Sequence, residues 1–214
     1  MFLAVYNWLT MRFKFLLILV FLFMFLGLVA QESKMKKFKH LSAPEKCWVI
    51  LHPFVAKKAL LITEEARKVT KDIKQEKLLK GNGNSGQIDA FRHTYWMALL
   101  TQQIGWRRAK SLGKAHEKGN YRDFKKHKKE DGVVPDKISS DMDFFNNNVG
   151  ILIGKMTTDL DLKGVVVEAV KDGKCKIIKI DTNGFFLDVE GNIIPKEELK
   201  GKWENDKCLV NSNQ

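Results

Sequence analysis

Three familiar catalytic signatures are missing from this sequence of 214 residues. It has no G-x-S-x-G for a serine hydrolase and no H-E-x-x-H for a zinc peptidase. It has no Walker loop either, because Gly81-Asn82-Gly83 is not followed by the Lys and Ser or Thr that a phosphate loop needs. No dense basic run stands beside stacked aromatic residues, so the sequence carries no specific signal for nucleic-acid binding.

Cysteine is scarce, with only Cys47, Cys175 and Cys208. Their spacing fits no zinc motif, and an odd number leaves at least one thiol unpaired or paired between chains. A bridge from Cys208 to either Cys175 or Cys47 could form in a compartment that permits disulfides, and the sequence does not choose between them.

Acidic residues are outnumbered, with 25 Asp and Glu against 37 Lys and Arg, for a formal net charge of +12. Such an excess favours contact with anionic matter, here anionic lipid or cell-wall polymer. The alternative is a solvated basic surface without a specific partner.

The one long apolar run lies near the N-terminus. Arg12 and Lys14 precede an uncharged stretch at residues 15–30. It is shorter than the ~20 residues of a membrane span and suits the apolar region of a signal peptide. We therefore expect export across the cytoplasmic membrane, with residues 1–30 acting as a cleaved signal or as an uncleaved anchor. The protein would then be periplasmic, secreted or membrane-anchored.

The remaining residues predict a mainly α fold, a compact helical domain with a small C-terminal β-hairpin or meander. Composition predicts a linker at residues 31–46, a helical core domain at residues 47–158 and a small β-containing extension at residues 159–214. In the extension, Asp181-Thr182-Asn183-Gly184 is expected to turn a hairpin between two apolar segments, since Asn-Gly is the strongest short hairpin signal. A short helix is expected at Lys196–Leu199.

Apolar residues at helical spacing predict four core helices. They are expected at residues 54–77, 87–104 and 106–118, and from Ser139 or Ser140, which can cap the last one, to about residue 157. Gly119-Asn120 is expected to end the third helix, and residues 121–137 to form an exposed loop.

Asp89 and His93 are four residues apart in the second of these helices. On a helical wheel they share a stripe with Trp96 and Leu100, and apolar residues lie on both flanks. A helix that is apolar on so many sides is a central one, so the polar pair is expected to be buried. Buried polar groups need partners, because an unsatisfied one costs about 1–3 kcal/mol.

The last core helix repeats the same offsets with Asp143, Asn147, Gly150 and Gly154. Two glycines on one helix face predict close backbone packing, here against the bulky Trp96 and Leu100 stripe. His116-Glu117, in the helix between, supplies the other polar groups that could join the cluster.

Residues 84–150 resemble a bacterial domain family of unknown function, whose members share an N-G/D-A-F-R-H-x-x-W helix, then H-E, then M-D-x-x-N-N-x-x-G. The matching residues are Asp89-Ala90-Phe91-Arg92-His93 with Trp96, His116-Glu117, and Met142-Asp143 with Asn146-Asn147 and Gly150. Some relatives resemble C-terminal modules of secreted bacterial toxins, which implies an effector activity in those architectures. The Lys-rich segment between His116 and Asp143 is longer here than in the pattern.

The functional hypothesis gathers these motifs into one buried site. A divalent metal ion would be bound by Asp89, His93, His116 and Asp143, and its water would hydrolyse a phosphoester or lipid. Without a metal, His93 or His116 would act as general base, oriented by Asp89 or Glu117. The expected supporting residues are Arg92, Trp96, Asn146 and Asn147, with Arg92 placed to steady a phosphate or an anionic intermediate.

The alternative is a non-catalytic protein of the cell envelope. In that case Asp89–His93 and Asp143–Asn147 are hydrogen bonds that lock the helix packing. The basic surface would then account for binding to lipid or polymer.

Overall fold

The computed structural model describes residues 35–81, 83–128, 134–157 and 161–214. The expected signal or anchor at residues 1–30 lies outside these ranges. The chain divides into two units, Met1–Leu41 and Ser42–Gln214, and all the helices and strands named below belong to the second. No helix among the described residues is both long enough and apolar enough to cross a bilayer.

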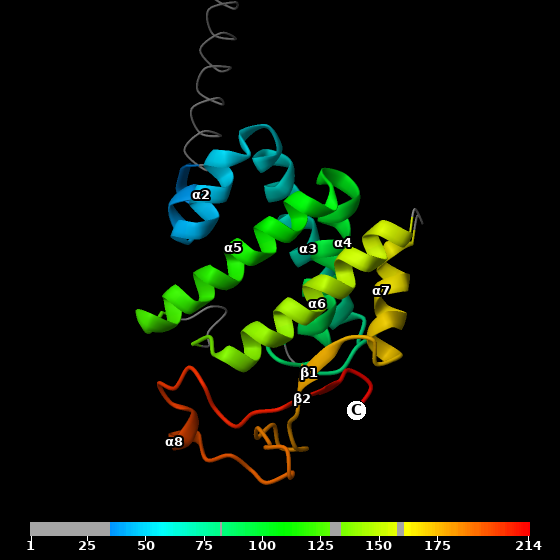
Figure 1. Cartoon of the computed structure of the whole chain (residues 1–214). Helices are drawn as coiled ribbons and strands as arrows, with labels where there is room; N and C mark the ends of the chain where they lie inside the picture. Colours follow the sequence, from blue (N-terminus) through cyan, green and yellow to red (C-terminus); the bar gives the residue numbers. More distant parts are fainter. Residues whose placement is uncertain (1–34, 82, 129–133, 158–160) are drawn as a thin grey trace, which may run out of the picture. The chain divides into compact units, whose positions relative to one another are not determined.

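The second unit is mainly helical, as predicted (Figure 1). Its elements are α2 (Ala43–Leu51), α3 (Pro53–Gln75), α4 (Gln87–Ile104), α5 (Trp106–Lys125), α6 (Lys137–Met156), α7 (Leu162–Lys171), β1 (Lys176–Ile178), α8 (Lys196–Leu199) and β2 (Leu209–Asn211).

Helix α4 is the central element, and it packs against α3, α5, α6 and α7. Its apolar residues face in several directions, and Phe91, Met97 and Leu100 have no exposed surface. Burying a side chain of this size contributes roughly 1.5–3 kcal/mol. The prediction of a central helix that carries a buried polar pair is confirmed.

Close packing of α6 on α4 is confirmed, but against a different face of α4 than the one predicted. A Cβ atom added to Gly150 would collide with the backbone carbonyl of Thr94, and one added to Gly154 would lie 2.6 Å from the carbonyl oxygen of Ala98. Trp96 instead points toward α3, where its indole nitrogen donates to Thr63 Oγ1 at 3.0 Å. The backbone of α4, rather than bulky side chains, therefore fills the space above the glycines.

Two predicted helix boundaries were wrong. Helix α5 does not end at Gly119-Asn120 but continues to Lys125 with both residues buried. Gly119 serves packing rather than termination, because an added Cβ would lie 2.5 Å from Ser42 Oγ. Helix α6 begins at Lys137, since Asp136 is its N-cap and Ser139 completes the capping box.

The C-terminal part contains more helix and less hairpin than predicted. Helix α7 occupies a stretch that was assigned to the β-containing extension. Strand β1 pairs antiparallel with β2, which follows after 30 intervening residues, and Ile177 lies opposite Val210. The predicted Asn-Gly hairpin yields only isolated bridges, Ile180 to Phe186 and Leu187 to Ile193. The expected helix at Lys196–Leu199 is confirmed as α8.

Neither of the two disulfides considered is formed, since all three cysteines are free thiols. Cys175 is buried with its sulfur 3.4 Å from Thr94 Oγ1. Cys208 lies 3.3 Å from the carbonyl oxygen of Asp188, and Cys47 is exposed.

Candidate metal centre

Helix α4 presents Asp89 and His93 from consecutive turns of its first half. A turn ahead of the helix fixes the carboxylate, because the Ser85 backbone N–H donates to Asp89 Oδ2 at 2.7 Å. Ser85 itself has a φ of 73°, in the left-handed region. The other oxygen, Oδ1, pairs with the Arg92 guanidinium at 2.7 Å.

Helix α6 brings Asp143 to the same point. His93 Nε2 lies 3.3 Å from Asp143 Oδ1 and 3.6 Å from Asp89 Oδ1. One ligand atom from each of these three residues lies within 4.8 Å of the others. All three residues are buried, with exposed fractions of 5% for Asp89, 3% for His93 and 7% for Asp143.

The surroundings shift the pKa values of two of these residues, Asp143 and His93. Burial, together with the charges of Asp89 and Glu117, raises the pKa of Asp143 well above its usual range, against the opposing charges of Arg92 and His116. Burial lowers the pKa of His93 well below its usual range, and the charges of Arg92 and His116 add to this, while the Asn147 side chain works in the opposite direction. The imidazole of His93 is therefore neutral at neutral pH, which is the form that binds metals.

Among the described residues, none donates a hydrogen bond to Asp143 Oδ1. The charge of Arg92 acts on Asp143, and its guanidinium lies 3.2 Å from His93 Nε2 and 2.7 Å from Asp89 Oδ1. A guanidinium group thus lies beside two of the three ligand atoms.

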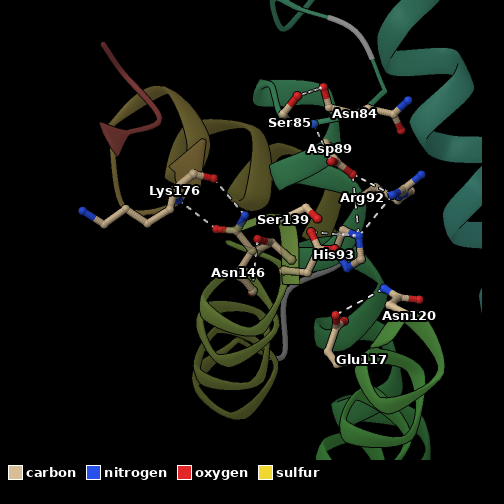
Figure 2. Close-up of polar contacts among 12 residues, drawn as sticks. Asn84, Ser85, Asp89, Arg92, His93, Glu117, Asn120, Ser139, Asn146 and Lys176 are labelled. Carbon is tan, nitrogen blue, oxygen red and sulfur yellow. Dashed lines mark hydrogen bonds and ion pairs between the residues drawn. The ribbon is translucent and has the colours of Figure 1, made fainter. Parts of the chain in front are cut away.

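His116 and Glu117 lie near this cluster on α5, and their side chains have different hydrogen-bond partners. The His116 ring centre is 6.2 Å from that of His93 and 5.7 Å from that of Trp96. Its Nδ1 lies 3.0 Å from Glu45 Oε1 on α2. Glu117 accepts from the Asn120 amide at 3.3 Å (Figure 2). His116 is thus near the cluster, but it is not in the group of three whose ligand atoms converge.

Glu45 is a site residue that the sequence reasoning missed. Its Oε2 accepts from the Ser42 backbone N–H at 2.8 Å, which completes a capping box, while its Oε1 holds His116. Burial opposes ionisation, yet the hydrogen bond and charge of His116 lower the pKa of Glu45 to about 2. The signal that could have found it is the S-x-x-E spacing of residues 42–45.

Asn146 and Asn147 have separate tasks despite being neighbours. Asn146 points away from the cluster, where its amide exchanges two hydrogen bonds with the backbone of Lys176, at 2.9 and 2.8 Å, and so ties α6 to β1 (Figure 2). Asn147 is buried and acts on His93. Of the two asparagines, therefore, only Asn147 belongs to the candidate centre.

A family model described as a domain of unknown function (DUF6973) matches residues 46–175. The chain belongs to this family. The matched span runs from within α2 to the residue before β1, and of the residues placed above around the cluster it leaves out only Ser42, Glu45 and Lys176. No curated protein and no solved structure matches the chain.

The DUF6973 domain thus offers two carboxylates and one neutral imidazole to a single point. Oxygen and imidazole nitrogen donors suit divalent ions such as Zn²⁺ and Mn²⁺ rather than soft ions that select thiolates. A divalent ion held by these three residues alone would keep an open coordination position for water.

Proposed function

We propose that this DUF6973 domain is a metal-dependent hydrolase in which Asp89, His93 and Asp143 bind one divalent ion. The convergence of three buried ligand atoms within 4.8 Å is the observation that carries the proposal. Two buried carboxylates that face one imidazole repel each other, and a divalent cation removes that cost. The metal would lower the pKa of a bound water, so that hydroxide is available near neutral pH.

Arg92 has a second role in this proposal. Its side chain is 24% exposed, whereas the Asp89 side chain that it contacts is 7% exposed. A metal ion would take over its contact with Asp89, and the released guanidinium would be able to bind an anionic substrate. A phosphoester, including the phosphoester of a lipid headgroup, is the substrate class that fits this pair of charges.

His116 serves as the general acid or base. Glu45 holds its Nδ1 at 3.0 Å and so orients the ring for proton transfer, as in other carboxylate–histidine pairs. Glu117 adds negative charge beside the ligands, which strengthens metal binding. This assignment separates His116 from the metal ligands Asp89, His93 and Asp143.

The test is hydrolysis by the purified full chain against a panel of phosphomonoesters, phosphodiesters and phospholipids. Activity should disappear with a chelator and return with Zn²⁺ or Mn²⁺. His93→Ala should be inactive, while Asn146→Ala, which weakens only the tie to β1, should retain the reaction chemistry. A metal-loaded chain that hydrolyses no member of the panel would leave the enzyme proposal without support.

The burial of the three ligands favours a second candidate, in which the ion cross-links α4 to α6 and the protein binds without catalysis. Metal binding would then raise thermal stability with no turnover. On either view we propose export through the N-terminal apolar run, with an anionic lipid or cell-wall polymer as partner. The motif likeness also leads us to propose that secreted bacterial toxins carry related modules.

A further inference from the structure

The corner between α2 and α3 exposes an unusual amount of apolar side chain. Ile50 is 67% exposed, Leu51 70% and Phe54 99%, although all three are large hydrophobic residues. They lie within five consecutive positions, at the last turn of α2 and the first turn of α3. Figure 1 shows this corner at the end of the second unit opposite β1 and β2.

The corner is shaped by local sequence rather than by packing. Pro53 occupies the first position of α3, where its missing N–H is no loss, and His52 joins the two helices. The His52 ring stacks on Trp48 with ring centres 4.5 Å apart, and its Nδ1 meets the Trp48 carbonyl oxygen at 2.9 Å. Trp48 itself is buried. The inner side of the corner is therefore fixed, and its apolar tip projects into solvent.

In the sequence on either side of the tip, the charges are of one sign. Between Glu45 and Glu64 the sequence contains Lys46, Lys57 and Lys58 and no Asp or Glu. Lys57 and Lys58 are exposed on the first turns of α3, directly after the tip. An apolar tip bordered by lysines matches the interface of a bilayer that contains anionic lipid, because the side chains enter the acyl boundary while the lysines stay at the headgroups.

We propose that the α2–α3 corner, Ile50, Leu51 and Phe54 with Lys57 and Lys58, inserts into the surface of an anionic membrane. The proposal does not depend on the metal centre. The apolar run at residues 15–30 precedes Ile50 by only about 20 positions, and a segment of that length reaches at most ~70 Å when extended. If that run enters or anchors in a bilayer, the corner stays within reach of the same membrane.

The experiment reports on the corner itself, so that an N-terminal anchor cannot produce a false positive. In full-length protein with Cys47→Ser and Cys208→Ser, Phe54→Cys is labelled with an environment-sensitive fluorophore; Cys175 is buried. Vesicles of phosphatidylcholine with and without phosphatidylglycerol carry nitroxide-labelled lipid. The control position is Val189→Cys, since Val189 is 75% exposed but lies between Asp188 and Glu190.

The expected result is a blue shift and nitroxide quenching at position 54 with anionic vesicles, and neither at position 189. Lys57→Gln with Lys58→Gln should lower the docking equilibrium constant by about 30-fold, on the order of fivefold for each lysine. An unshifted fluorophore at position 54 in anionic vesicles overturns the proposal. A blue shift at position 54 without vesicles also overturns it. If that shift grows with protein concentration, a second copy of the chain covers the corner. If it is independent of concentration, the chain's own N-terminal segment covers it.

Discussion

Replacing Gly150 by alanine tests whether contact between the α4 and α6 backbones sets the geometry of the metal centre. The new Cβ would collide with the Thr94 carbonyl and lie 2.9 Å from Met97 Cβ. Backbone cannot yield as a flexible side chain does, so α6 must move away from α4. Overpacking costs roughly 1–3 kcal/mol, and a backbone collision belongs at the upper end. Alanine regains up to about 1 kcal/mol of helix propensity, which leaves a net loss of about 2 kcal/mol.

Gly113→Ala is the matched control, because Gly113 is also a buried helix residue, but its added Cβ would meet only side-chain ends, Met97 Cε at 3.3 Å and Asn147 Nδ2 at 3.4 Å. That variant should be neutral or up to about 1 kcal/mol more stable. Urea unfolding followed by circular dichroism gives both free energies. The reasoning fails if Gly150→Ala is as stable as Gly113→Ala. Because Asp143 is on α6, Gly150→Ala should also weaken metal binding, and it should do so more than Gly113→Ala, which shifts no helix backbone.

Three other substitutions give separate tests. Glu45 has a pKa of about 2 in the folded protein, below its ordinary 4.5, so its contribution to stability is complete above pH ~4.5 and is lost as the pH falls toward 2. Acid unfolding of Glu45→Gln should lack this contribution, which is about 3 kcal/mol from the difference of about 2.5 pH units. An acid unfolding profile equal to that of the wild type would contradict this prediction. Lys207→Met removes the ammonium group that lies 2.6 Å from Oδ2 of buried Asp136, and it should lower the free energy of unfolding in urea by about 3 kcal/mol. A loss below about 1 kcal/mol would show that Asn205 and the α6 N-terminus satisfy Asp136 without Lys207. Arg92→Leu removes the cation that neighbours Asp89, so calorimetric titration should show tighter metal binding, and an activity assay should show lower turnover of phosphoesters. Weaker metal binding would mean that Arg92 supports the ligands instead.

The central helix and its polar pair could be predicted because their signal is periodic. Asp89 and His93 fall on one stripe between apolar flanks, and that pattern fixes burial whatever the neighbouring helix turns out to be. Gly150 and Gly154 also indicated that the backbone of another helix lies close to α6. Their partner could not be identified, because spacing along α6 says nothing about which face of α4 it meets.

The errors arose where a local signal was overridden by a distant contact. Gly119 resembles a helix terminator in sequence, yet Ser42 lies against it from far along the chain and the helix continues. The Asn-Gly turn at residues 183–184 is present, but Leu209–Asn211 competes for the edge of β1 and limits the hairpin to single bridges. Glu45 lies beside His116 because α2 packs on α5, and the spacing of residues along the sequence does not reveal that contact.

The central claim is that Asp89, His93 and Asp143 form one metal site, and calorimetric titration of the metal-free full chain with Zn²⁺ and Mn²⁺ tests it most directly. Asp143→Asn is the decisive partner variant, since it removes one ligand charge while keeping the side-chain shape and relieves the repulsion from Asp89 and Glu117. The account predicts one ion per wild-type chain and loss of binding in Asp143→Asn, whose metal-free form should be at least as stable as wild type. Absence of binding by the wild-type chain, or equal binding by Asp143→Asn, would contradict it.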